Sequence, residues 1–226
     1  MHIPDGFLNP HTCILMYIVS LIFLVWAWRG AKRTLPRSFV SLVAICSALI
    51  LIAQMVNFPL AGGASSWHIM GGTLVSVILG PHATIISMSI VLLIQALLFG
   101  DGGISAFGAN VFNMAVIGGL SFYIVKLLLS PSFSKKRFAA SLFIATWISS
   151  VLTALATGIE IGFHPIVAPV GGIVVTVPTM LLFYVPSGLA EAAITVPLVL
   201  SLSKITPRTL HGLTQLRERT LNTISN

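Results

Sequence analysis

The first two residues of the chain carry a set of nitrogen atoms that could chelate a metal ion. The free amine of Met1, the backbone amide nitrogen of His2 and the Nδ1 atom of its imidazole can all reach one ion. Chelation closes two small rings, which holds the three nitrogens nearly in a plane with a fourth position open. An ionised amide is a strong-field donor, so the set suits Ni(II) or Cu(II) in square-planar coordination, and Co(II) less well. Because the amine and the amide must lose protons, binding should weaken as the pH falls.

This chelate requires that the mature chain begins at Met1. The segment before residue 13 contains no Lys or Arg and no apolar run of the kind that a signal peptide has. A bulky His at position 2 also disfavours removal of the initiator methionine. We therefore expect Met1 to be the mature amino terminus, with Pro4 stiffening the chain and Gly6 permitting a turn just after the chelate.

The composition places the chelate on a membrane protein. The chain has 226 residues, of which 56% are hydrophobic and only 8% charged, and its mean hydropathy is +1.02. A soluble domain carries about 25% charged residues, so a soluble enzyme, a disordered chain and a soluble nucleic-acid binder are excluded. The length accommodates about six or seven helices of roughly 20 residues. This predicts an all-α fold, a single polytopic bundle of membrane helices over residues 1–226.

The basic residues predict the orientation of this bundle. All twelve Lys and Arg residues fall in three groups of four: Arg29, Lys32, Arg33 and Arg37; Lys126, Lys135, Lys136 and Arg137; Lys204, Arg208, Arg217 and Arg219. Basic residues in short loops stay on the cytoplasmic side, so all three groups should be inside the cell. No aromatic residues interleave with them as on a nucleic-acid surface, so we interpret them as topology charges and expect no nucleic-acid partner.

The parity of the crossings then predicts seven spans, with the N-terminus outside and the C-terminus inside. The expected spans are residues 13–28, 39–56, 69–79, 83–99, 108–125, 138–160 and 179–203. Residues 1–12 would be an extracellular segment that carries the chelate, and residues 204–226 a basic cytoplasmic tail. The apolar stretch 164–178 is interrupted by Pro and Gly, so we interpret it as a re-entrant or interfacial segment on the outer side.

Three histidines on the expected outer side are candidates for the fourth ligand: His11, His68 and His164. His82 and His211 fall in segments expected on the inner side and are therefore excluded. Spacing alone does not choose among the three outer histidines.

Polar side chains inside the spans are costly to bury, so each calls for a function or a partner. Glu191 should lie several residues inside the last span, which makes it functional or bonded to a neighbour, whereas Glu160 should be a solvated helix end. Asp101 lies in a glycine-rich outer loop, either as a turn residue or as part of a cap that offsets the charge of a bound metal. Hydrogen bonds between helices are expected of a further set of amides: Gln54, Asn57, Asn110 and Asn113.

Three motifs together resemble one known family. They are MHIPDGFL at residues 1–8, QMVNFP at 54–59 leading to His68 and Gly71-Gly72, and GDGGISAFGANVFNMA at 100–115. In this order, and over most of the chain, the sequence resembles the nickel/cobalt substrate-binding (S) membrane subunits of energy-coupling-factor (ECF) transporters.

The resemblance implies a seven-helix subunit with an outward amino terminus, as the parity count also predicts. It implies a planar four-nitrogen site made by the Met1 amine, the His2 amide and imidazole, and His68, which corresponds to the loop histidine of the family. Ni(II) or Co(II) would be bound as transported substrate, with no cofactor. We expect nearby polar side chains to surround these ligands: Asp5, Asn57, Ser66 and Asp101.

The resemblance also implies partners in the cell membrane. A membrane coupling (T) subunit and two cytoplasmic ATPases would supply the energy, since the chain has no nucleotide-binding motif of its own. The small accessory subunit that is fused to some members would be separate or absent here. One position departs from the family: many members carry a His before the Gly188…Glu191 element, where this chain has Tyr184. This leaves the role of that position in a shared path for metal open.

Two other functions remain open beside metal transport. One is an intramembrane enzyme that uses Glu191, Asp101 and His164, although no catalytic triad or phosphate-binding loop accompanies these residues, and we expect no enzymatic activity. The other is a vitamin-type ECF subunit, whose pocket would use aromatic and polar side chains and would not need a free Met1 amine. Within metal transport, the rigid planar set with its amide donor favours nickel over cobalt.

Overall fold

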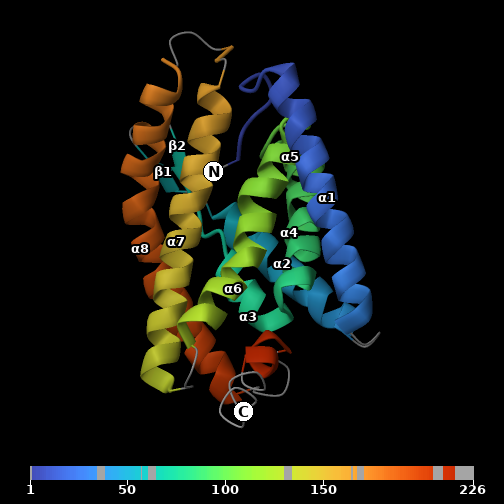
Figure 1. Ribbon diagram of the computed structural model, residues 1–226, viewed down its shortest axis with the longest axis vertical. Coiled ribbons are helices and arrows are strands. Elements are labelled where there is room, and N and C mark those ends of the chain that lie inside the picture. The colour runs from blue at the N-terminus through green and yellow to red at the C-terminus, as the bar shows by residue number, and fades with distance from the viewer. Residues whose placement is uncertain are drawn as a thin grey trace.

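Helices form most of the chain, and they run side by side as a bundle (Figure 1). The computed structural model describes residues 2–34, 39–56, 58–60, 65–129, 134–163, 165–166, 171–205 and 211–216, with 58–60 and 65–67 described by their backbone only. The α-helices are α1 (Pro10–Thr34), α2 (Val40–Met55), α3 (Gly72–Leu79), α4 (Pro81–Ile94), α5 (Phe107–Asn110), α6 (Ile117–Leu129), α7 (Lys135–Gly162) and α8 (Ile173–Ile205). Residues 211–216 form a further short helix.

Two departures from regular α-helix occur near the expected outer loops. The π-helical turn η3 (Gln95–Phe99) continues α4, and η4 (Val111–Val116) joins α5 to α6. A short antiparallel pair, β1 (Phe58–Leu60) and β2 (Ser65–Trp67), precedes α3, with Phe58 opposite Trp67. The prediction of an all-helical chain is therefore correct except for these two three-residue strands.

The predicted spans are confirmed for five segments. Within the described residues, five helical stretches are long and apolar enough to cross a membrane: Pro10–Thr34, Pro81–Phe99, Phe107–Leu129, Lys135–Gly162 and Ile173–Ile205. The other two expected spans are present as α2, of 16 residues, and α3, of eight. A span needs about 20 residues, so the chain is a multi-pass membrane bundle and the count of seven stays a prediction.

The prediction of a re-entrant or interfacial segment at 164–178 is wrong for residues 173–178, which are helical. α8 begins at Ile173, and Pro178 lies inside this helix of 33 residues. Close packing on α7 stabilises the start of α8, because a Cβ atom on Gly158 would lie 2.8 Å from the Val177 Cα atom. The Thr176 hydroxyl also donates to the Gly158 carbonyl at 2.6 Å. Proline inside a membrane helix leaves backbone groups unpaired, and neighbouring helices and Ser or Thr hydroxyls can satisfy them. The sequence pattern does not reveal these contacts. Residues 164 and 167–170 lie outside the described residues.

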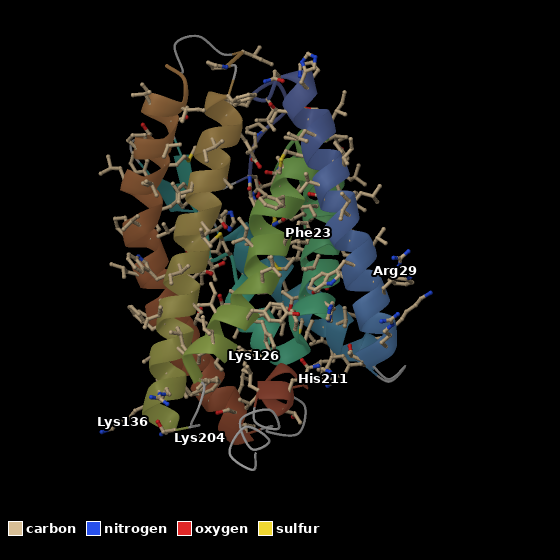
Figure 2. All side chains as sticks on the ribbon, in the orientation of Figure 1. Phe23, Arg29, Lys126, Lys136, Lys204 and His211 are labelled. Atoms are coloured by element: carbon tan, nitrogen blue, oxygen red, sulfur yellow. The ribbon has the colours of Figure 1, made fainter. Side chains whose placement is uncertain are left out.

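The two ends of the bundle differ in character. Figure 2 shows the labelled lysines Lys126, Lys136 and Lys204 toward one end of the bundle, with Arg29 nearer the middle. The segment before α1, dark blue in Figure 1, lies toward the other end and turns back into the bundle. The amino-terminal segment and the three lysines are thus separated along the long axis.

A close contact between α1 and α5 fixes one wall of the region that receives the amino-terminal segment. A Cβ atom on Gly108 would lie 2.5 Å from the Tyr17 backbone nitrogen, so only glycine allows the two helices to approach this closely. The Ser20 hydroxyl donates to the Gly108 carbonyl across the same contact. This contact holds the GANVFNMA motif, and with it Asn110, beside the start of the chain.

Candidate metal centre

The backbone of Ile3 is clamped inside the bundle. Its N–H donates to Oδ1 of Asn110 at 2.8 Å, and its carbonyl accepts from Nδ2 of the same residue at 3.1 Å. The Gly103 N–H donates to that carbonyl as well, at 2.8 Å. Buried peptide groups are costly unless hydrogen-bonded, so this pairing allows the segment to enter the interior. The position of His2 is set by this clamp.

Asp5 anchors the same segment on its outer side. Its carboxylate accepts hydrogen bonds from the Ile104 N–H at 3.1 Å and from the Ser105 N–H at 2.7 Å, and also from the Ser105 hydroxyl. The Ser105 hydroxyl and the two N–H groups hold the pKa of Asp5 below its usual value. Gly103 leaves room for this contact, because a Cβ atom there would lie 2.3 Å from the Asp5 nitrogen. Asp5 therefore ties the chain start to the 100–105 loop and does not contact His2.

The His2 imidazole is buried against Asp101. Its side chain is 5% exposed, and its Nδ1 atom lies 3.0 Å from a carboxylate oxygen of Asp101. Burial lowers the pKa of His2, while the hydrogen bond to Asp101 opposes that shift. The same hydrogen bond holds the pKa of Asp101 below its usual value. The pair therefore consists of a neutral imidazole and an ionised carboxylate near neutral pH.

The His2 ring stacks on the ring of His68. Their centroids are 4.9 Å apart and their planes differ by 18°. His68 is buried, and burial holds its pKa well below the usual value, so it too is a neutral imidazole. Neutral imidazole is the form that binds transition metals. The structure thus brings together two histidines that are 66 positions apart in the sequence.

The segment that carries His68 is held from two sides. The Gln54 side-chain amide donates to the Met70 carbonyl at 2.8 Å. The Gly71 N–H donates to the Glu191 carboxylate at 2.8 Å, at the start of α3. The Ser150 hydroxyl donates to the other Glu191 oxygen at 3.3 Å. Glu191, deep in α8, is therefore hydrogen-bonded to neighbouring segments. This is one of the two roles expected for it from the sequence.

Gln95 is a residue of the site that the sequence analysis missed. Its side-chain amide donates to Oε1 of Gln54 at 3.0 Å, and it interacts with the His2 imidazole. The Nε2 atom of His2 and Oε1 of Gln95 are both buried, and neither has a hydrogen-bond partner among the described residues. The only signal in the sequence is a lone amide in an otherwise apolar run, and π-helical η3 places this amide in the interior.

The remaining candidates are distributed as follows. Of the histidines proposed as the fourth ligand, His11 is exposed in the first turn of α1 and His164 lies outside the described residues. Met1 and Asn57 also lie outside them, and the Ser66 side chain is not described. His68 is therefore the candidate that the structure places against His2.

The prediction for Glu160 is wrong. Its carboxylate is buried rather than solvated, and it accepts a hydrogen bond from the Asn113 amide at 2.6 Å. The end of α7 is covered because neighbouring Ile161 packs with Ile3 and Ala109, which no local pattern reveals. The described carboxylates thus each have a separate partner, and no acid pair suited to an intramembrane enzyme is formed by Asp101 and Glu191.

Side chains alone do not complete a metal site here. No group of three or more His, Cys, Asp or Glu residues in an arrangement suited to a metal occurs within the described ranges. A metal ion between His2 and His68 would need further donors. The backbone nitrogen of His2 is the donor adjacent to its imidazole.

Comparison with known proteins gives a family match over nearly the whole chain. The profile of the CbiM family, described as the cobalt uptake substrate-specific transmembrane region, matches residues 2–209. The chain is 40% identical over 205 residues to a protein of Archaeoglobus fulgidus, and 35% identical over 223 residues to the fused nickel transport protein NikMN of Rhodobacter capsulatus. These alignments cover 88% and 93% of this chain but 64% of each relative, so the chain spans about two thirds of their length.

Solved structures give the same result. A crystal structure described as a transition metal transporter superposes with a TM-score of 0.83 and 35% sequence identity, over 97% of this chain and all of the other. The relatives are named as transport proteins, which confirms the expectation that the chain is not an enzyme.

Replacement of Asn110 should release the amino-terminal segment. In the Asn110→Ala variant the Ile3 N–H loses its acceptor, and an unpaired buried group costs about 1–3 kcal/mol. We expect amide hydrogen exchange at Ile3 to become roughly ten- to hundredfold faster, measured on the purified protein by mass spectrometry. Asn113→Ala is the matched control, because this residue lies one turn further on and bonds to Glu160 instead. Unchanged exchange at Ile3, or an equal acceleration in the control, would contradict the clamp.

Proposed function

We propose, since this chain belongs to the CbiM family, that it captures Ni(II) or Co(II) as the substrate-binding membrane subunit of an ECF-type transporter. The observation that carries the proposal is the buried contact of His2 with His68 at the inner end of a clamped amino-terminal segment. A chain start that binds nothing normally stays in water, whereas this one is buried beside two neutral imidazoles. A metal ion is the ligand that this combination suits.

The proposed ligands are four nitrogen atoms. His2 supplies its backbone nitrogen and Nδ1, His68 supplies an imidazole nitrogen, and Met1 supplies the terminal amine. The proximity of the His2 and His68 rings, whose centroids are 4.9 Å apart, supports the two imidazoles as ligands. The His2 backbone nitrogen is the donor that the chelate chemistry adds. The contribution of Met1 rests on the chelate chemistry of the amine and the adjacent amide.

Asp101 has a defined role in this proposal. Metal binding requires that Nδ1 of His2 carry no proton, so the neutral imidazole would hold its proton on Nε2, and the Asp101 carboxylate 3.0 Å from Nδ1 would stay ionised. A dication bound by one ionised amide keeps one net positive charge. The ionised Asp101 offsets that charge in a site from which water is largely excluded. Asp5, by contrast, supports the site indirectly by fixing the loop that carries Asp101.

The choice of metal follows from the donor set. Four nitrogens in a plane, one of them an ionised amide, favour Ni(II) over Co(II). Copper would bind such a set more tightly on intrinsic affinity, so selection against copper must come from availability or from the transport cycle. The Rhodobacter capsulatus relative is named for nickel and the family for cobalt, and both names lie within this range.

The transport role requires partners and a defined orientation. We propose that the amino-terminal end faces outward and the basic end faces the cytoplasm of the cell membrane, as the positive-inside rule indicates. A membrane coupling (T) subunit and two cytoplasmic ATPases would drive release of the metal. The accessory subunit fused to some members would be a separate chain or dispensable.

Loss of either imidazole should abolish tight metal binding. Changes to residues that only contact the metal ligands typically weaken metal affinity 10- to 100-fold. Removal of a ligand by His2→Ala or His68→Ala should therefore weaken nickel affinity by more than about tenfold. Nickel retained by the purified protein is measured by elemental analysis and titration, and thermal unfolding shows that each variant is folded. His11→Ala is the control and should bind as the parent chain does. Stoichiometric nickel in a folded His2→Ala or His68→Ala protein would refute the assignment.

The role of the terminal amine is tested by adding one glycine before Met1. This converts the amine into an amide and displaces the new amine from the chelate, so nickel affinity should fall by at least about tenfold. A glycine added after Asn226 serves as the control. Unaltered nickel affinity in the protein extended before Met1 would contradict the amine as a ligand. A vitamin-binding subunit would keep its affinity for the vitamin in both extended proteins.

A further inference from the structure

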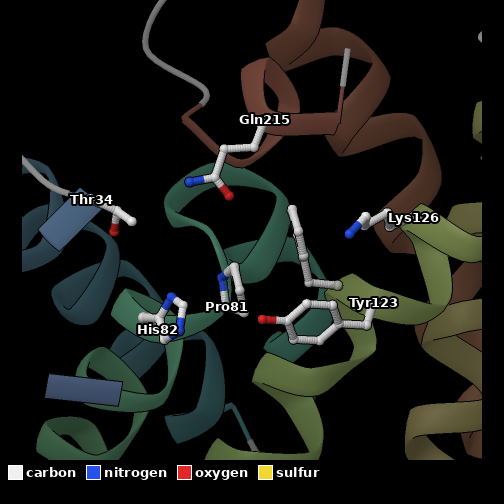
Figure 3. Close-up of a pocket in the computed structure, with 7 residues that line it drawn as sticks. Thr34, Pro81, His82, Tyr123, Lys126 and Gln215 are labelled. Carbon is white, nitrogen blue, oxygen red and sulfur yellow. The ribbon is translucent and has the colours of Figure 1, made fainter. Parts of the chain in front are cut away.

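A cavity lies at the end of the bundle that carries Lys126, Lys136 and Lys204. It has a volume of about 310 Å³, at the lower end of the roughly 300–1,000 Å³ that is typical of small-molecule sites. Four elements contribute to its lining: Thr34 of α1, Pro81 and His82 of α4, Tyr123 and Lys126 of α6, and Gln215 of the 211–216 helix (Figure 3).

The walls of this cavity are held in place by close contacts. A Cβ atom on Gly30 would lie 2.1 Å from the His82 ring, so this glycine of α1 makes room for the imidazole. The Trp26 ring, one turn earlier on α1, also packs against this imidazole, with the two ring centroids 4.5 Å apart. Gly212 seats the last helix on α3, because a Cβ atom there would lie 2.5 Å from the Ser76 carbonyl oxygen. The cavity is therefore a built feature of the bundle.

The polar side chains of the cavity can each donate a hydrogen bond, and the Gln215 amide nitrogen also lies 2.9 Å from Nε2 of His211. In Figure 3 the Gln215 amide and the Tyr123 hydroxyl lie on either side of Pro81, and the Lys126 ammonium points toward them from α6. Lys126 approaches the Tyr123 ring at 5.9 Å, which orients the ammonium along this wall. One positive charge with several neutral donors is a combination that recognises an anion.

No carboxylate of the described residues neutralises Lys126. Asp5 is bonded to the 104–105 backbone, Asp101 to His2, and the two glutamates to other partners, namely Asn113 for Glu160 and Gly71 for Glu191. The last turn of α1 adds basic residues beside Thr34, at Lys32 and Arg33. The field at this end of the described structure is therefore positive.

We propose that this cavity binds the phosphate headgroup of an anionic phospholipid. The next residue along α6, Leu127, is 75% exposed and can lie against the acyl chain of a lipid whose headgroup reaches Lys126. The cytoplasmic leaflet is rich in anionic lipids, and basic pockets between helices on that side bind their headgroups. Lys126 pairs with the phosphate charge, and Thr34, Tyr123 and Gln215 donate hydrogen bonds to its oxygens. The leaflet assignment rests on the orientation given in the proposed function.

The test uses the full chain in nanodiscs of phosphatidylglycerol and phosphatidylcholine, with bound lipid counted by native mass spectrometry after release into detergent. A basic side chain near the membrane surface changes anionic lipid binding about fivefold, so Lys126→Gln should reduce retained phosphatidylglycerol by about that factor. Lys126→Arg keeps the charge and should retain the lipid. Lys136→Gln is the matched control, because it removes an exposed charge from the same end, outside the cavity.

Two results would overturn the proposal. Equal loss of phosphatidylglycerol in Lys126→Gln and Lys136→Gln would mean that surface charge alone holds the lipid. Displacement of the lipid by inorganic phosphate or glycerol phosphate, with the same dependence on Lys126, would assign the cavity to a soluble phosphate. Nickel binding is measured on the same proteins and should be unchanged in Lys126→Gln. A failure of the metal proposal is thereby distinguished from a failure of the lipid site.

Discussion

The site depends on the hydrogen-bonded burial of the first residues of the chain. A chain start normally stays in water, because an unsatisfied peptide group in the interior costs about 1–3 kcal/mol. Asn110 satisfies both the N–H and the carbonyl of Ile3, which leaves that residue 1% exposed. His2 is adjacent to this clamp and is carried to His68 by it. Without the Asn110 side chain the proposed metal-binding nitrogens would lose the contact that satisfies the adjacent buried peptide groups.

The polar groups around His2 come from segments that depart from regular α-helix. Gln95 begins the π-helical turn η3, whose end at Gly100 has a left-handed backbone with φ of 65°. Asp101 follows directly, and its N–H donates to the Gln95 carbonyl at 3.1 Å. Asn110 lies just before the second π-helical turn, η4. Such turns are frequent at functional sites because the extra residue redirects the side chains that follow.

The sequence reaches local features of the chain more readily than the surroundings of the candidate site. The chelate at Met1 and His2 is a local property of two residues, and five long apolar helices follow from composition. Glu160 and Gln95 were misjudged or missed because their environment depends on helices that are distant in the sequence. Hydropathy likewise does not show that most residues of the eight-residue α3 are buried against other parts of the protein.

The most direct test of the central claim is X-ray absorption spectroscopy at the nickel edge on the metal-loaded protein in detergent. The account predicts a square-planar edge feature and a single shell of four nitrogen donors, with the outer-shell scattering of two imidazole rings. A six-coordinate shell that contains oxygen, or the scattering of fewer than two imidazoles, would contradict a site built from the amino terminus, His2 and His68.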